Sequence, residues 1–257
     1  MLKSLISAFA MYSKIPMPEI EWSEENHKYS LCFFPLIGLI IGFVEYIWGA
    51  FCYAFQIGTV LYSAVSVIIP VIVTGGIHLD GFCDVLDAKN SYADRERKLE
   101  IMKDSRVGAF ALIGLVSYFI IQFGLYSEIS SERAFMSSGI IFIISRALSG
   151  TGAVTLKCAK KSGTLQGFSE PADRKITLVS LILIYAFCIL FLIYIDMLCG
   201  ISVFLVSALS FVYYRNFSYK TFGGITGDLA GYFLQICEIS MLGVIVLCDI
   251  LERGVCC

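Results

Sequence analysis

A run of 34 residues, positions 46–79, contains no Asp, Glu, Lys or Arg, and such a run leaves few soluble folds open. Further apolar blocks follow it, and most approach the roughly 20 residues that a helix needs to cross a bilayer. Hydrophobic residues make up 58% of the chain and charged residues only 16%, whereas roughly a quarter are charged in soluble domains. We therefore expect an all-α fold, a polytopic integral membrane bundle that forms one domain over residues 1–257.

These blocks predict about seven transmembrane helices. The uncharged run is too long for a single span, so we divide it at residues 56–58. Residues 1–13 are shorter and are expected to form an amphipathic helix at the membrane surface. The predicted spans are residues 31–52, 58–77, 108–126, 134–154, 176–195, 198–214 and 230–250.

The distribution of Lys and Arg predicts the orientation of the chain. With the N-terminus in the cytoplasm, sixteen of the nineteen Lys and Arg residues fall in cytoplasmic segments, two fall outside and one lies within a span. This asymmetry follows the positive-inside rule and depends on an odd number of spans. Polar residues gather in the same cytoplasmic segments, so we expect any reaction at the cytoplasmic face.

Charge and cysteine usage exclude several classes of site. A net charge of −2 gives no general attraction to nucleic acid, which is therefore not an expected partner. The ten cysteines form no C-x-x-C pair and most lie in apolar blocks, where free thiols behave as small hydrophobic groups. With only two histidines, the spacing argues against a zinc site.

Three aspartates follow the second predicted span. Asp80, Asp84 and Asp87 share one face of a helix, because positions i, i+4 and i+7 lie within 60° of each other at 100° per residue. Carboxylates that repel each other in this way suit Mg²⁺, which also holds substrate phosphates. A solvated acidic face is the simpler alternative. His78 lies on the opposite side of the same helix, where a packed histidine is the simpler interpretation.

Two further segments resemble phosphate sites in composition. In 103-KDSRVG-108, Lys103 and Arg106 flank Asp104, although basic residues are common where a span meets the cytoplasm. In 223-GGITGDLAG-231, glycines precede the last span, and a helix N-terminus there would offer N–H groups to an anion. A plain helix cap with Asp228 in the first turn explains the second segment equally well.

Three charged residues lie inside predicted spans: Glu45, Arg146 and Glu238. A charge at the middle of a membrane helix costs roughly 2.5–3.5 kcal/mol on insertion scales. Arg146 and Glu238 both fall near the middle of their spans. We expect them either to pair with each other or to contact a substrate.

The chain resembles the cobalamin synthase (adenosylcobinamide-GDP ribazoletransferase) family. The resemblance extends almost from end to end in ordered blocks. These blocks are 14-KIPMP-18, 34-FPLIGLIIG-42, 78-HLDGFCDVLDA-88, 101-IMKDSRVGAF-110 and 223-GGITGDLAG-231.

This resemblance implies a multi-pass enzyme of the bacterial inner membrane, with its active face in the cytoplasm. It would join adenosylcobinamide-GDP to α-ribazole or α-ribazole 5′-phosphate, release GMP and require Mg²⁺. The resemblance does not determine whether the enzyme forms a homo-oligomer. The metal ligands would come from Asp80, Asp84, Asp87, Asp104 and Asp228. The catalytic residues would be Asp84, Asp87, Lys103 and Arg106. The substrate contacts would be Lys14, His78, Arg146, Gly223, Gly224, Thr226 and Gly227.

Two other functions compete with this interpretation. A CDP-alcohol phosphatidyltransferase-like lipid synthase also uses an aspartate-rich helix at a membrane face, but its D-G-x₂-A-R spacing is absent after Asp80-Gly81. A small-solute transporter would use Glu45, Arg146 and Glu238 as a path for an ion or substrate. It would leave the aspartate helix without a role.

Overall fold

The computed structural model describes residues 1–21, 23–159, 164–170 and 172–255. Within these residues the secondary structure is helical apart from one isolated bridge between Cys158 and Ile225. The all-α prediction is therefore confirmed. The helices are α1 (Leu2–Tyr12), α2 (Glu24–His27), α3 (Phe34–Ala54), α4 (Thr59–Thr74), α5 (Ile77–Asn90), α6 (Arg95–Ile101), α7 (Ala109–Glu128), α8 (Glu132–Thr155), α9 (Thr164–Ser169), α10 (Arg174–Ile195), α11 (Met197–Phe222) and α12 (Gly227–Val255), with a 3₁₀ turn η1 (Ser30–Phe33) before α3.

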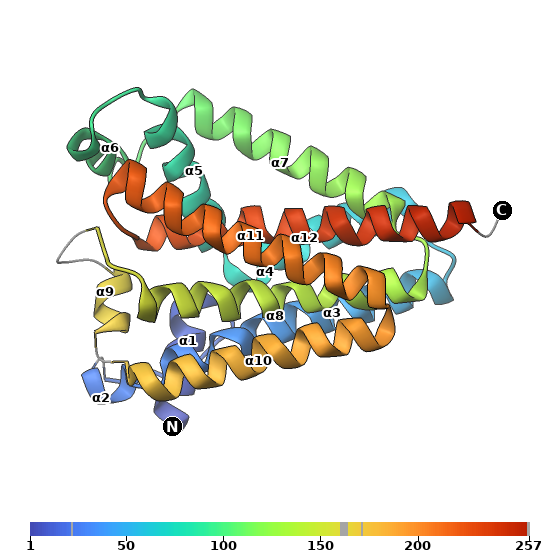
Figure 1. Cartoon of the computed structure of the whole chain (residues 1–257), viewed down its shortest axis with the longest axis horizontal. Coiled ribbons are helices and arrows are strands. Elements are labelled where there is room, and N and C mark those ends of the chain that lie inside the picture. The colour runs from blue at the N-terminus through green and yellow to red at the C-terminus, as the bar shows by residue number, and fades with distance from the viewer. Residues whose placement is uncertain (22, 160–163, 171, 256–257) are drawn as a thin grey trace.

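The long helices run side by side and form a multi-pass membrane bundle (Figure 1). In the described residues six helical segments are long and apolar enough to cross a membrane. The first of them ends with α3, and the other five are α7, α8, α10, α11 and α12. Each coincides with a predicted span. The largest difference is at α11, which continues to Phe222, past the predicted end at residue 214. This extension contains Arg215 and Lys220, so charged residues do not end the helix.

In the remaining predicted span, 58–77, the helix α4 ends at Thr74, and the chain then changes direction. α4 has 16 residues and is therefore about 24 Å long, shorter than the roughly 30 Å of a bilayer core. Gly75 and Gly76 then take positive φ angles of 67° and 78°, and the chain bends by 97° into α5. α5 consequently lies across one end of the bundle, near α6 (Figure 1).

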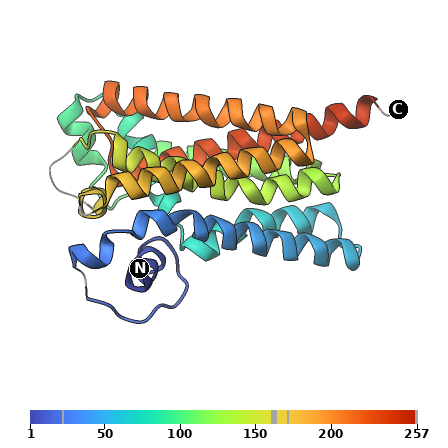
Figure 2. The same ribbon diagram turned by 60° about the horizontal axis from the view of Figure 1, so that its bottom comes forward.

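α1 also runs across the bundle instead of along it, and Figure 2 shows it nearly end-on beside α3. Its buried residues are Ser4, Ser7, Ala8 and Phe9, so one face packs on the protein. This arrangement agrees with the surface helix expected for residues 1–13. It also brings the end of α1 to the same end of the molecule as α5.

Candidate active site

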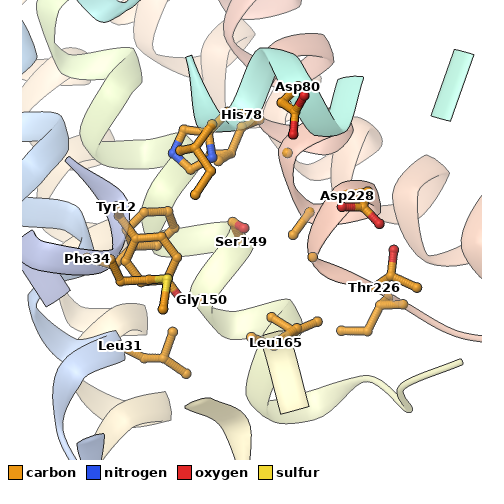
Figure 3. A pocket seen from close by; sticks show the side chains of 18 of the residues that line it. Tyr12, Leu31, Phe34, His78, Asp80, Ser149, Gly150, Leu165, Thr226 and Asp228 are labelled. Atoms are coloured by element: carbon orange, nitrogen blue, oxygen red, sulfur yellow. The ribbon is translucent and has the colours of Figure 1, made fainter. Parts of the chain in front are cut away.

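A cavity of about 460 Å³ opens at the end of the bundle where α5 crosses it (Figure 3). A pocket of this volume holds one small ligand. Its walls come from seven helices or turns and from the segments that follow α6, follow α8 and precede α12. They include Tyr12, Leu31, Phe34, His78, Asp80, Lys103, Ser149, Thr226, Gly227 and Asp228.

Close contact between α5 and α12 creates the acidic side of this cavity. A Cβ atom added to Gly81 would lie only 2.7 Å from the Cα of Asp228, so the two backbones touch at this point. Phe82 and Tyr232 stack beside it, with ring centroids 5.6 Å apart. The helix that carries Asp80 is thereby fixed against the first turn of α12, and Asp80 and Asp228 face the same space (Figure 3).

Asp84 belongs to the same acidic cluster, although it does not line the cavity. Partial burial raises the pKa of Asp84 to about 7, and the negative charges of Asp80, Asp228 and Asp87 add to this effect. The predicted stripe on α5 is thus brought together with Asp228, a residue about 150 positions later in the sequence. The repulsion within the cluster would fall if a cation entered it.

Asp87 makes two hydrogen bonds to the start of α7 that the sequence did not indicate. Its Oδ2 accepts a hydrogen bond from the backbone N–H of Gly108 at 2.6 Å, and its Oδ1 accepts one from Ala111 at 2.8 Å. Both oxygens therefore hold the first turn of α7, whose N–H groups have no partners within the helix. Asp87 caps a helix from a distance, and this use of both oxygens argues against a metal ligand or a base.

We expect Asp87→Ala to affect the stability of the protein more strongly than its catalytic rate. Loss of a capping carboxylate costs about 0.5–2 kcal/mol, so the melting temperature in detergent should fall while the turnover of folded protein changes little. Asp173→Ala is a matched control, because Asp173 caps α10 through one hydrogen bond to Ile176. Lost turnover at an unchanged melting temperature would instead show that Asp87 takes part in the reaction.

The segment after α6 divides into residues inside and outside the cavity. Lys103 lines it, whereas Asp104 and Arg106 pair with each other at 2.6 Å on the surface. Hydrogen bonds from Arg106 lower the pKa of Asp104 to about 2. The structure does not bring Asp104 into the acidic cluster, and the Arg106 side chain is 87% exposed. In this structure Asp104 and Arg106 therefore pair with each other, and neither lines the cavity.

The glycine-rich segment before α12 is similarly divided. Gly223 and Gly224 end α11 with φ angles of 81° and 158°, and neither lines the cavity. They let the next residue, Ile225, exchange backbone hydrogen bonds with residues 157–159. Thr226 and Gly227 do line the cavity, and the Thr226 hydroxyl accepts a hydrogen bond from Leu229, which caps α12. The expected phosphate cradle is therefore reduced to the N-terminus of α12.

Three of the predicted substrate contacts lie outside the glycine-rich segment: Lys14, His78 and Arg146. Of these three, only His78 lines the cavity. The backbone N–H of Lys14 donates to the carbonyl of Val73 at 2.8 Å, and its side-chain stem lies over Gly75. Lys14 thus covers the break between α4 and α5. It does not reach the cavity wall in this structure.

Arg146 forms a buried ion pair and does not line the cavity. Its Nη1 donates to Glu238 Oε1 at 2.6 Å, and the two side chains are 1% and 3% exposed. Ser145 also donates to this oxygen, at 2.7 Å. The predicted pairing of Arg146 with Glu238 is therefore confirmed. The third charge within the spans, Glu45, is buried on α3.

Several cavity residues were not predicted from the sequence. Tyr12 ends the surface helix, Phe34 begins α3, and Ser149 and Gly150 lie on α8. Each is a residue type that packs in ordinary helices, so nothing in the local sequence marks it. Only the position of Phe34 at the start of 34-FPLIGLIIG-42 gave a signal, through the family resemblance.

The donor set at the cavity fits Mg²⁺. In the described part of the chain, no group of three or more His, Cys, Asp or Glu side chains is arranged to enclose a metal ion. Mg²⁺ at phosphate sites seldom needs such a cage, because one or two carboxylates, water and substrate oxygens complete its coordination. Asp80 and Asp228 supply carboxylates of this kind on facing helices.

Comparisons with known proteins identify relatives along almost the whole chain. The family model for cobalamin-5-phosphate synthase matches residues 4–246. An adenosylcobinamide-GDP ribazoletransferase from Lachnoclostridium phytofermentans is 40% identical over 95% of this chain and 93% of its own length. Enzymes of the same name from Clostridium botulinum strain Alaska E43 and Clostridium perfringens strain SM101 are 36% and 32% identical, over 93% and 95% of this chain and 95% and 98% of their own.

No solved structure matches the chain. The match to the family model covers nearly the whole sequence, and it includes every helix that lines the cavity. The chain therefore belongs to the cobalamin-5-phosphate synthase family.

Proposed function

We propose that this protein is a membrane transferase that joins adenosylcobinamide-GDP to α-ribazole or α-ribazole 5′-phosphate and releases GMP. The observation that carries the proposal is the match of residues 4–246 to the family, in a chain whose relatives bear this enzyme's name. The acidic cavity is the proposed location of this reaction. A lipid synthase or a transporter is not favoured, because neither accounts for this match.

The reaction is the displacement of GMP from a phosphoanhydride by an alcohol, and it leaves a phosphodiester. A ribose hydroxyl oxygen of α-ribazole forms a bond to the phosphorus nearest the corrinoid. The phosphoanhydride bond then breaks, and its bridging oxygen leaves with GMP. The hydroxyl proton passes to a base, and the corrinoid keeps one phosphate that now links it to the nucleoside. Such transfers depend mainly on positioning and on neutralising charge at the phosphoryl oxygens.

Residues at the cavity wall supply both of these effects. The first N–H groups of α12, next to Thr226 and Gly227, attract the diphosphate, and Lys103 adds a full positive charge. Asp80 and Asp228 would hold Mg²⁺, which when bound supplies charge neutralisation at the phosphoryl oxygens. Asp84 stays the predicted proton acceptor, because it belongs to the same acidic cluster as Asp80 and Asp228.

The test uses the purified full-length protein in detergent. With adenosylcobinamide-GDP, α-ribazole and Mg²⁺ we expect GMP release in proportion to the corrinoid product. Release should fall to background when a chelator removes divalent metal and should return when Mg²⁺ is added in excess. Activity that survives chelation would contradict the metal assignment. Substrate flux into liposomes without GMP release would contradict the transferase.

We further propose that the cavity faces the cytoplasm of the bacterial inner membrane. The support is the distribution of Lys and Arg, because the cavity lies at the end of the bundle that carries most of them. A cysteine introduced at exposed Lys103 should react with a membrane-impermeant maleimide in inside-out vesicles and not in intact cells, in a background that lacks reactive native cysteines.

A further inference from the structure

The cavity has two walls of different chemistry, and Figure 3 shows them on opposite sides. Asp80, Thr226 and Asp228 lie on one side. Tyr12, Phe34 and Leu31 lie on the other, and none of these three carries a charge. A ligand that fits this cavity therefore has one polar, phosphate-seeking end and one apolar end.

The apolar wall is built around three rings from separate parts of the chain. The ring centroids of Tyr12 and Phe34 lie 4.4 Å apart. His78 stacks near-parallel to Tyr12 at 6.5 Å and meets the edge of Phe34 at 5.8 Å. The guanidinium of Arg146 lies 6.0 Å from the Phe34 ring, and this residue is fixed by its ion pair with Glu238. The wall is consequently a packed aromatic surface, in which Phe34 and His78 are buried and Tyr12 is half-buried.

We propose that Tyr12, Phe34 and His78 bind the aromatic base of the nucleoside substrate; this inference rests on the proposed function. The base of α-ribazole is a benzimidazole, a flat ring system with few hydrogen-bonding atoms, and such rings stack on aromatic side chains. With the base on this wall, the ribose extends across the cavity toward Asp80 and Asp228. That is the side on which its hydroxyl must attack.

The other flat ring among the substrates, the guanine of adenosylcobinamide-GDP, fits this wall less well. Guanine carries several hydrogen-bond donors and acceptors along its edges, and Leu31 and Phe34 would leave them without partners. The size of the cavity gives a second reason. About 460 Å³ suits one nucleoside, whereas the corrinoid nucleotide is several times larger and has to remain mostly outside.

Tyr12 is thus a specificity-determining residue for the nucleoside. We expect Tyr12→Ala to raise KM for α-ribazole about tenfold or more, because the ring that stacks on the base is lost. The KM for adenosylcobinamide-GDP and the kcat at saturation should change less than about twofold, since the lost contact is the same in the ground and transition states. Tyr12→Phe keeps the ring and should behave like the wild type.

Tyr53→Ala is the matched control, because Tyr53 is 82% exposed near the other end of α3. In the wild type, free benzimidazole should compete with α-ribazole and not with adenosylcobinamide-GDP, and this measurement needs no variant to fold. Competition with the corrinoid substrate, or a Tyr12→Ala protein with unchanged KM for α-ribazole, would overturn the assignment. Absence of GMP release by the wild type would instead overturn the proposed function.

Discussion

Asp80→Asn and Asp228→Asn should each lower kcat by about a hundredfold to a thousandfold while the protein stays folded. Each substitution removes one negative charge from the cavity wall and keeps the size of the side chain. The loss falls on the step in which charge at the phosphoryl oxygens is neutralised, and electrostatic groups of this kind are worth roughly 10²–10³ in rate. GMP release under saturating substrate and Mg²⁺, together with the melting temperature in detergent, measures both parts of the expectation.

Two further variants, Asp173→Asn and Asp104→Asn, are controls for this result. Asp173→Asn should be near normal, because the amide oxygen can keep the cap on α10 that Asp173 provides. Asp104→Asn should lose much less activity than Asp80→Asn, because Asp104 pairs with Arg106 on the surface. Equal loss at Asp104 and Asp80 would favour the ligand set expected from the sequence. Near-normal turnover in both Asp80→Asn and Asp228→Asn would exclude the metal assignment.

The fold was largely predictable because a bilayer limits the choices. Apolar blocks of sufficient length have to become helices, since backbone groups in lipid must be hydrogen-bonded within the segment. The bend after α4 was the main omission. Gly75 and Gly76 stand in an apolar sequence that continues past them, and hydropathy does not respond to the left-handed conformation that both adopt. The helical face shared by Asp80 and Asp84 was predictable, because it depends only on local geometry.

The remaining site depended on contacts between distant segments. Nothing near Asp87 in the sequence shows that Gly108 and Ala111 need its oxygens. Tyr12 and Phe34 meet only because α1 folds back across the start of α3. The pairing of Asp104 with Arg106 is local, yet the same residues would also suit a phosphate site. Composition alone could not separate these two arrangements.

Arg146→Met should destabilise the protein strongly, even though Arg146 does not touch the cavity. The substitution leaves Glu238 buried in the bundle without its partner, and breaking a buried pair in this way costs about 3–5 kcal/mol. For a chain of this size, the melting temperature in detergent should fall by roughly 6–20 °C. Any effect on KM for α-ribazole would follow from the loss of the guanidinium beside Phe34.

The double variant Arg146→Met/Glu238→Gln distinguishes an ion pair from simple packing. Removing the charge of Glu238 takes away the penalty that Arg146→Met creates, and Ser145 can still donate to the remaining amide oxygen. The double variant should therefore melt closer to the wild type than Arg146→Met does, with a coupling energy of roughly 1–3 kcal/mol. Additive losses would show that the two residues act independently, and the pair would then have no special part in holding α8 against α12. If instead the double variant is stable but inactive, the Arg146–Glu238 pair acts in the reaction, which the enclosed geometry argues against.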